Sequence, residues 1–133
     1  MRHIIIASHH RLAEGLADTL RFVGGDMPIG VVCAYMDDTP VEEQVDAAFA
    51  GVDSADEVLV FTDMMQGSVN QAFLQRKDEH VFIVTGINLP CALELALYTG
   101  SLTAAYVHEV IDRARQELLF VNDCVVSVDE DDE

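Results

Sequence analysis

Short apolar runs alternate with amphipathic segments along most of this chain. The runs are rich in β-branched residues, which is typical of buried strands. The predicted strands cover residues 3–7, 29–35, 57–62 and 80–85. Because a helical pattern lies between successive strands, the sequence predicts an α/β fold with a mainly parallel open sheet and helices on both faces.

The helices are predicted from apolar spacing. Leu12, Leu16 and Leu20 stand four residues apart and predict the buried face of the first helix, which a pair of glycines stops after residue 23. The predicted helices cover residues 11–23, 40–50, 68–77 and 89–98, and a last amphipathic helix follows Gly100 and ends at residue 118.

Three polar residues are predicted to cap helices. Thr39 and Ser68 are each followed three residues later by Glu or Gln, which is the capping-box pattern of a helix N-terminus. Asn88 precedes Leu89 and Pro90 and is predicted to cap the next helix. Asp37 and Asp38 are expected to cap a turn.

The C-terminal residues carry a separate prediction. Residues 123–128 are short and β-branched, so we predict a strand that pairs at a sheet edge, in this subunit or in a partner. Residues 129–133 are acidic and are predicted to be a solvated tail. We therefore predict one domain over residues 1–128.

The overall composition excludes some partners. The 133 residues carry a formal net charge of −17, which opposes nucleic-acid binding because phosphate backbones are held by basic side chains. The three cysteines are far apart in apolar sequence and are predicted to be reduced core residues. With no apolar stretch of membrane-spanning length and no leader pattern, we expect no membrane insertion and a cytoplasmic location.

The candidate chemistry lies where the strands end, because ligands bind beyond the carboxyl ends of parallel strands. The first strand is followed by Ser8, His9 and His10, and the third by Asp63. A carboxylate that accepts Nδ1–H of a histidine leaves the Nε2 lone pair free to attack. The Ser68 hydroxyl and the N–H groups that open the third helix are suited to stabilise a phosphoryl group on that nitrogen. The sequence thus indicates His9 as nucleophile and Asp63 as its orienting partner.

Three segments resemble one known family. These are IIIASHHRLAEGL (residues 4–16), TDMMQGSVNQAF (62–73) and VTGINLPCALEL (84–95). They resemble, in the same order, the active-site segments of the mannose/fructose/sorbose-type enzyme IIA components of the bacterial sugar phosphotransferase system. The resemblance spans most of the chain, which makes it more specific than any single segment.

The resemblance implies a function and a set of site residues. It implies a phosphotransferase that accepts a phosphoryl group on His9 from the histidine-containing phosphocarrier protein and passes it to a IIB component for sugar uptake. It gives Asp63 the role of holding the imidazole and places Gly67 and Ser68 beside the phosphate. It also implies a homodimer with an exchanged C-terminal strand. We expect no cofactor and no metal. The candidate site-lining residues are His10, Met64, Met65 and Asn88.

Two positions depart from the family pattern. The family usually has Gly after the active histidine, where this chain has His10, and Gly-Gly-Ser-Pro where this chain has Gln66-Gly67-Ser68-Val69. These changes alter the backbone conformations open to a phosphate-binding loop. His10 is therefore a competing acceptor, although the family register and the shared Ser8 favour His9.

Other functions remain open from the residues alone. Asp63 ends the third strand where receiver domains carry a phosphorylated aspartate, but the acidic pair and late lysine of receivers are missing here. A regulatory phosphohistidine domain without transport coupling would keep the same His9. A metal site of His9, His10 and Asp63 has plausible ligands but no motif-grade spacing. A hydrolase is disfavoured because no G-x-S-x-G elbow surrounds a serine.

Overall fold

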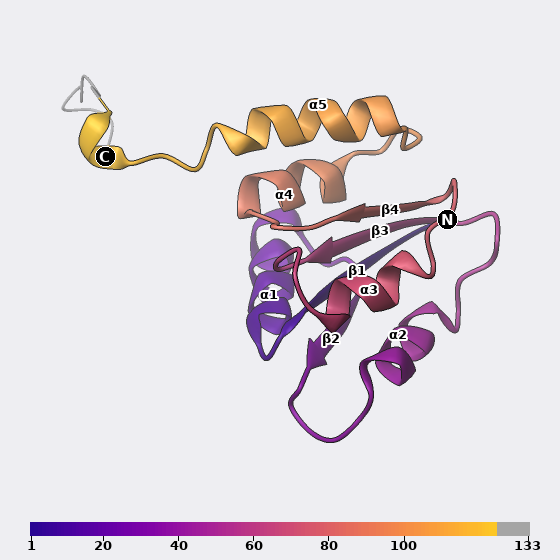
Figure 1. The fold of residues 1–133 in the computed structure, drawn as a ribbon. Helices are drawn as coiled ribbons and strands as arrows, with labels where there is room; N and C mark the ends of the chain where they lie inside the picture. The colour runs from indigo at the N-terminus through magenta and orange to yellow at the C-terminus, as the bar shows by residue number, and fades with distance from the viewer. Residues whose placement is uncertain (125–133) are drawn as a thin grey trace.

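Four parallel strands form the centre of the fold in the computed structural model, which describes residues 1–124 (Figure 1). Their order across the sheet is β2-β1-β3-β4. The strands are β1 (Arg2–His9), β2 (Ile29–Ala34), β3 (Glu57–Thr62) and β4 (Val81–Val84). The predicted strands are all present, and the predicted parallel α/β fold is confirmed.

Helices cover both faces of the sheet, as predicted (Figure 1). Helices α1, α4 and α5 pack on one face and α2 and α3 on the other. Their bounds are α1 (Leu12–Gly24), α2 (Val41–Phe49), α3 (Ser68–Leu74), α4 (Leu89–Leu97) and α5 (Ala104–Arg115). Within residues 1–124, none of these helices has the length and apolarity needed to cross a membrane.

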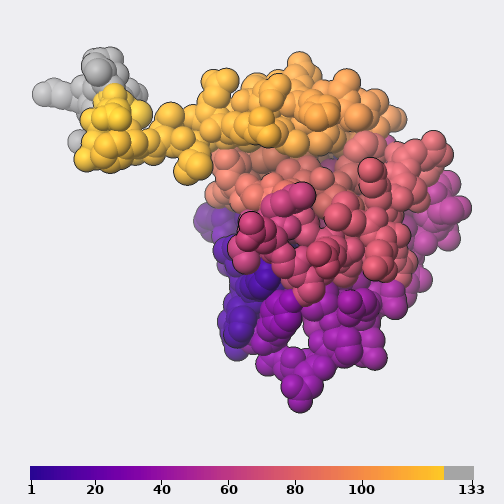
Figure 2. All heavy atoms as spheres, viewed as in Figure 1, coloured from indigo at the N-terminus to yellow at the C-terminus, as the bar shows by residue number. Residues whose placement is uncertain are grey.

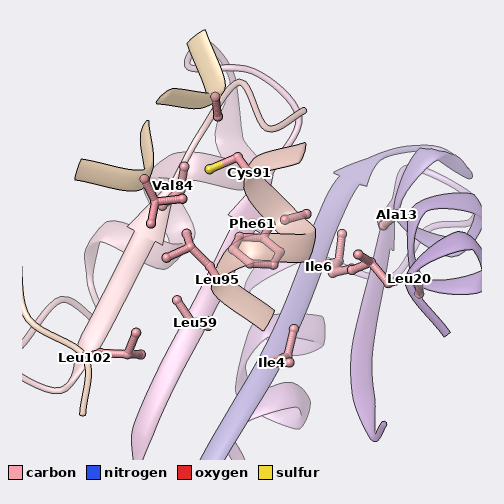
Figure 3. Close-up of a cluster of buried hydrophobic side chains, with 14 residues drawn as sticks. Ile4, Ile6, Ala13, Leu20, Leu59, Phe61, Val84, Cys91, Leu95 and Leu102 are labelled. Carbon is pink, nitrogen blue, oxygen red and sulfur yellow. The ribbon is translucent and has the colours of Figure 1, made fainter. Parts of the chain in front are cut away.

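Alternation along the central strands divides the core into two layers. Ile4 and Ile6 of β1 point toward α1 and α4, where Phe61 of β3 joins them (Figure 3). Ile5 of β1 and Val60 of β3 point to the opposite face, toward α2 and α3. Each fully buried side chain of this size stabilises the fold by about 1.5–3 kcal/mol. Burial on both faces explains why these strands are continuous apolar runs in the sequence.

The buried face of α1 differs from the predicted leucine line. Ala13, Ala17 and Leu20 are buried, whereas Leu16 is half-buried and Leu12 is 59% exposed. Four residues of α-helix turn through about 400°, so each leucine lies about 40° around from the one before it. From Leu20 back to Leu12, each leucine therefore points farther from the core than the one after it. The two alanines lie against the sheet instead.

Two of the predicted caps are wrong. Pro40, not Thr39, is the N-cap of α2, and the Thr39 N–H instead donates to Asp37 Oδ1 at 2.8 Å. Gly67, not Ser68, is the N-cap of α3, with φ of 115°. The third cap is confirmed, since Asn88 Oδ1 accepts the Cys91 N–H at 3.0 Å.

The C-terminal part of the described chain leaves the body of the molecule. Helix α5 ends at Arg115, earlier than predicted, and the following residues extend away from the sheet and helices (Figure 2). Asp123, the first residue of the predicted edge strand, lies in the 3-10 helix η1 (Val121–Asp123). Residues 125–128 of that strand and the acidic tail 129–133 lie outside the described residues.

Candidate active site

The topology of the sheet brings the ends of β1 and β3 together. The two strands are neighbours, and all four strands point to the same edge of the sheet (Figure 1). His9 is the last residue of β1, and Asp63 follows β3 directly. The helix after β1 packs on one face and the helix after β3 on the other, which makes this the switch point where open α/β sheets bind ligands.

His9 and Asp63 are joined by two hydrogen bonds. The backbone N–H of His9 and its Nδ1 each lie 2.9 Å from Asp63 Oδ2. The other carboxylate oxygen accepts the Met64 N–H at 3.0 Å. The histidine side chain is 27% exposed and the carboxylate 11% exposed. The structure thus brings together the two residues that sequence reasoning paired.

The hydrogen bonds keep the Asp63 carboxyl group ionised. Burial alone raises the pKa of Asp63, but the His9 backbone N–H, the His9 ring and the Met64 N–H together lower it below its ordinary value. An ionised carboxylate only accepts hydrogen bonds, so Nδ1 of His9 carries the proton. In the neutral form of the ring the lone pair is then on Nε2, on the opposite side from Asp63.

Gly67 lies directly against that free nitrogen. A Cβ atom at this position would be 3.0 Å from His9 Nε2 and 3.2 Å from Cε1. The residue also has φ of 115°, a conformation that side-chain-bearing residues rarely adopt. A glycine here both permits the turn into α3 and leaves space in front of His9 Nε2.

Tyr35 is a neighbour of His9 that sequence reasoning missed. Its ring stacks on the imidazole with 5.4 Å between centroids and 27° between planes, and its hydroxyl is hydrogen-bonded to Ser68 Oγ. Strand β2 ends at Ala34, one residue earlier than predicted, and Tyr35 has φ of 66°. A non-glycine residue in this region costs about 1 kcal/mol or more. The predicted strand included Tyr35 as its last residue, so its ring was not expected beside His9.

Comparison with known proteins identifies the family of this chain. The family model described as the PTS system fructose IIA component matches residues 3–114. The chain belongs to this family. The resemblance found in the sequence is confirmed, and a IIA component is a phosphotransferase component of the sugar phosphotransferase system.

Solved structures resemble this IIA component along nearly its full length. A protein from Klebsiella pneumoniae, assigned as a phosphoenolpyruvate-dependent sugar phosphotransferase system permease, is 30% identical, with 94% of each chain covered and a TM-score of 0.85. The PTS IIA protein associated with the fucose utilization operon of Streptococcus pneumoniae is 27% identical, with 91% of this chain and 93% of that chain covered and a TM-score of 0.77.

A third solved structure shares the fold. The mannose/sorbose specific IIA subunit from Enterococcus faecalis is 20% identical and has a TM-score of 0.68, with 96% of this chain and 95% of that chain covered. At this identity the likeness is one of architecture alone. The two chains therefore share a fold at low sequence identity.

In this IIA component, His10 serves the loop through its backbone. It has φ of 56°, its N–H donates to the Ala34 carbonyl at 2.9 Å, and its side chain is exposed. The buried Ser8 hydroxyl donates to the His10 carbonyl at 2.9 Å and accepts the Ala13 N–H at 2.7 Å. Glycine adopts this left-handed backbone most easily, so the conformation fits the glycine that the resemblance implies at this position.

Asn70 is a second residue that sequence reasoning missed. It is 4% exposed, its Oδ1 accepts the Thr62 hydroxyl at 2.8 Å, and its Nδ2 donates to the Met65 carbonyl at 3.3 Å. A buried amide that loses such partners is costly, so the arrangement is held firmly. It fixes the loop between Asp63 and Gly67 to the end of β3. The sequence feature that could have identified Asn70 is an amide residue inside the predicted capping box, residues 68–71.

The remaining candidates lie around or away from His9. Met64 and Met65 are 49% and 67% exposed, beside Asp63. Asn88 uses both polar atoms elsewhere, since it caps α4 and its Nδ2 donates to the Ala114 carbonyl at 2.8 Å. Among residues 1–124, no three His, Cys, Asp or Glu side chains gather as a metal site would require, so the alternative metal site gains no support.

Proposed function

We propose that Nε2 of His9 accepts a phosphoryl group from the histidine-containing phosphocarrier protein and passes it to a IIB component during sugar uptake. The observation that carries this proposal is the contact of His9 Nδ1 with the ionised Asp63, which leaves Nε2 as the reacting nitrogen. Membership of the IIA family supports a role in sugar phosphotransfer generally.

The proposed step conserves protons as well as phosphorus. The Nε2 lone pair of neutral His9 attacks the phosphorus of the donor's phosphohistidine, and the donor's P–N bond breaks with its electron pair returning to the donor nitrogen. His9 then carries the phosphoryl group on Nε2 and a proton on Nδ1, so its ring becomes cationic. The Asp63 carboxylate at 2.9 Å stabilises that positive charge. Transfer to a IIB component is the same reaction in reverse with a new acceptor.

The space for the phosphoryl group is bounded by Gly67 and Ser68. Gly67 leaves room at Nε2, because even one added carbon would lie 3.0 Å from that nitrogen. The Ser68 hydroxyl is next in the chain and can donate to a phosphoryl oxygen. In a chain of net charge −17, neutral donors of this kind carry much of the binding of an anionic group.

The surface around His9 suits transient protein docking. Four large apolar side chains at this edge of the sheet are exposed, and two of them are methionines that directly follow Asp63. These side chains are Leu12 at 59%, Met36 at 40%, Met64 at 49% and Met65 at 67%. The strongly acidic surface outside them favours encounters with partners that carry basic residues.

A homodimer is a second part of the proposal. Leu118 to Val121 form a segment that extends from the body, with Leu118 at 87% and Phe120 at 66% exposure (Figure 2). Such a run of exposed apolar residues is typical of an interface. Among residues 1–124, β4 pairs with β3 alone, and a hollow of about 390 Å³ lies between β4 and α5. We propose that residues 118–121 of a second copy pack against the outer side of β4.

Sedimentation velocity tests the dimer. We expect Phe120→Asp to shift the protein toward the monomer, because a charge in the apolar segment opposes burial. Phe22→Asp is the matched control, since Phe22 is 89% exposed on α1 and lies outside the segment. A wild-type protein that sediments as a monomer at micromolar concentration contradicts the dimer.

The proposed location is the cytoplasm. All three cysteines are free thiols, but only Cys91 is a buried core residue as predicted, since Cys33 is half-buried and Cys124 follows the 3-10 helix η1. Burial raises the pKa of the Cys91 thiol. Thiols that persist in this state are usual in a reducing compartment. A soluble phosphocarrier donor would meet the protein there.

Labelling with the phosphorylated carrier protein tests the acceptor. The carrier is phosphorylated with ³²P and incubated with wild type, His9→Gln and His10→Gln. We expect labelling to be lost in His9→Gln and retained in His10→Gln, because only His9 contacts Asp63. The adduct should be labile in acid and stable in alkali, as phosphohistidine is.

Three other outcomes are informative. A label that survives His9→Gln, or one that is lost in alkali as an aspartyl phosphate is, contradicts the proposal. A label on His9 that no IIB component accepts would identify a regulatory phosphohistidine domain instead.

A further inference from the structure

Tyr35 contacts His9 on a side that Asp63 does not. The carboxylate lies at the Nδ1 edge of the imidazole, whereas the phenol ring lies over its face at 5.4 Å. The hydrogen bond between His9 Nδ1 and Asp63 Oδ2 fixes the position of one edge of the imidazole. The imidazole can still tilt about the line that joins these two atoms. A stacked aromatic ring removes that freedom. The two contacts together define the direction of Nε2.

The backbone of Tyr35 shows that its position is held against a preference. Tyr35 is 47% exposed and has φ of 66°. Burial of the side chain therefore does not account for a left-handed tyrosine at this position. Conformations of this kind persist where the surrounding contacts require them, and they concentrate at functional sites. The contacts in question are the imidazole of His9 and the hydroxyl of Ser68.

The hydroxyl group of Tyr35 has a separate partner. It is hydrogen-bonded to Ser68 Oγ, at the start of α3 and next to the glycine that faces Nε2. A serine hydroxyl has one proton to donate and two lone pairs that accept. If the phenol donates to Ser68, the serine proton stays available for a phosphoryl oxygen. The ring of Tyr35 thus acts on the nucleophile, and its hydroxyl acts on a phosphate donor.

We propose that Tyr35 is a positioning residue for phosphoryl transfer. Its ring sets the tilt of the His9 imidazole, and its hydroxyl group sets the orientation of the Ser68 hydroxyl. This inference rests on the proposed role of His9. It adds a residue that joins the end of β2 to the two parts of the site contributed by β1 and α3.

Three substitutions separate the two roles of Tyr35. Tyr35→Phe keeps the ring and removes the hydroxyl, Tyr35→Leu removes the stacking, and Tyr35→Gly also removes the left-handed strain. Tyr106→Leu is the matched control, because the Tyr106 ring on α5 stacks on Tyr98 rather than on His9. Circular dichroism and thermal melts check that each variant folds.

The first readout is the His9 ring in the unphosphorylated protein. Its ¹⁵N chemical shifts report the tautomer, and its relaxation reports ring motion. We expect Tyr35→Phe to leave both unchanged, and Tyr35→Leu and Tyr35→Gly to increase ring motion. This readout needs no phosphoryl transfer, so it decides the Tyr35–His9 contact even if His9 is not the acceptor.

The second readout is the rate of transfer from the phosphorylated carrier protein. We expect kcat to fall about 10- to 100-fold in Tyr35→Leu and Tyr35→Gly, because a misaligned nucleophile reacts slowly, with KM changed far less. Tyr35→Phe should lose a smaller factor, about 2- to 10-fold, and Tyr106→Leu should match wild type. If Tyr35→Gly folds, keeps a rigid His9 ring and transfers at the wild-type rate, Tyr35 is not a positioning residue. Absence of any label on wild-type His9 would instead remove the proposed function.

Discussion

Strands β1 and β3 carry two histidine–aspartate pairs, one at each end. At the amino end His3 Nε2 lies 2.8 Å from Asp56 Oδ2, and at the carboxyl end His9 Nδ1 lies 2.9 Å from Asp63 Oδ2. The side chains are similarly accessible, at 22% and 15% in the first pair and 27% and 11% in the second. Contact length and burial therefore do not distinguish the two pairs.

The nitrogen that each pair leaves free does distinguish them. In His3 the nitrogen that contacts the aspartate is Nε2, which is the ring nitrogen farthest from the backbone. The outward-facing nitrogen of His3 is therefore already in a hydrogen bond. Asp56 also accepts the Asp53 N–H at 3.1 Å and lies 3.5 Å from the amino terminus of the chain. His9 uses Nδ1, so Nε2 faces outward to the space beside Gly67. The first pair ties the chain together, and the second leaves a ring nitrogen facing outward, as the proposed phosphoryl acceptor requires.

Replacing each aspartate by asparagine should give the largest contrast. Asp63 accepts three hydrogen bonds with two oxygens, and asparagine has only one acceptor oxygen, so Asp63→Asn disturbs the His9 tautomer. We expect the transfer rate from the phosphorylated carrier to fall about 100-fold or more. Asp56→Asn should leave the rate unchanged. Equal rates in the two variants would mean that the carboxyl-end pair is also structural.

Adding one carbon to two glycines gives a smaller contrast. Gly67 and Gly25 both have left-handed φ, 115° and 91°, but only Gly67 has His9 within 4 Å of the added Cβ. Gly67→Ala and Gly25→Ala should each lose about 1–2 kcal/mol of stability in urea titrations. Only Gly67→Ala should also slow transfer, by about 10-fold. A Gly67→Ala protein with full transfer activity would show that Nε2 does not react in this space.

Acid should affect the two pairs alike, and this is the smallest effect. The hydrogen bond from His3 lowers the pKa of Asp56 below its ordinary value. Burial raises the pKa of Asp63, but its hydrogen bonds from His9 and Met64 lower it further than burial raises it. A lowered folded-state pKa stabilises the fold fully above the ordinary value of about 3.9, and the stabilisation is lost as pH falls through the folded value.

Equilibrium unfolding between pH 7 and pH 2 measures this effect. The difference in free energy of unfolding between wild type and either asparagine variant should shrink as pH falls from about 5 to about 2. A difference that grows over this range would reverse the sign and contradict the assigned hydrogen bonds. If the free energy of unfolding depends on pH in the same way in the two variants, the two pairs contribute alike to stability in acid. They would then differ only in the ring nitrogen that each leaves free.

The sequence predicted the fold and the central pair because both depend on long-range patterns. Strands buried on both faces appear as continuous apolar runs, so the ends of β1 and β3 could be located to within a residue or two. Once those ends are known, parallel topology places His9 and Asp63 at one edge. The contact between them then follows from the adjacency of two strands.

The parts of the site that were missed depend on single backbone conformations. Tyr35 reads as one more β-prone residue, and its left-handed φ follows from contacts with His9 and Ser68 that lie far apart in the sequence. Ser68 fits a capping box, yet Gly67 takes the cap because the loop must pass close to His9. Local patterns do not contain these tertiary contacts. Leu12 likewise keeps helical spacing but lies beyond the edge of the core.

The most direct test of the account is to identify the nitrogen that carries the phosphate. The protein is labelled with ¹⁵N in histidine, phosphorylated with the carrier protein, and studied by NMR through ¹⁵N–³¹P coupling and long-range proton–nitrogen correlations in alkaline buffer. We predict coupling of phosphorus to Nε2 of His9 and a proton on Nδ1. Phosphorus bound to Nδ1 of His9, or to either nitrogen of His3 or His10, would contradict it.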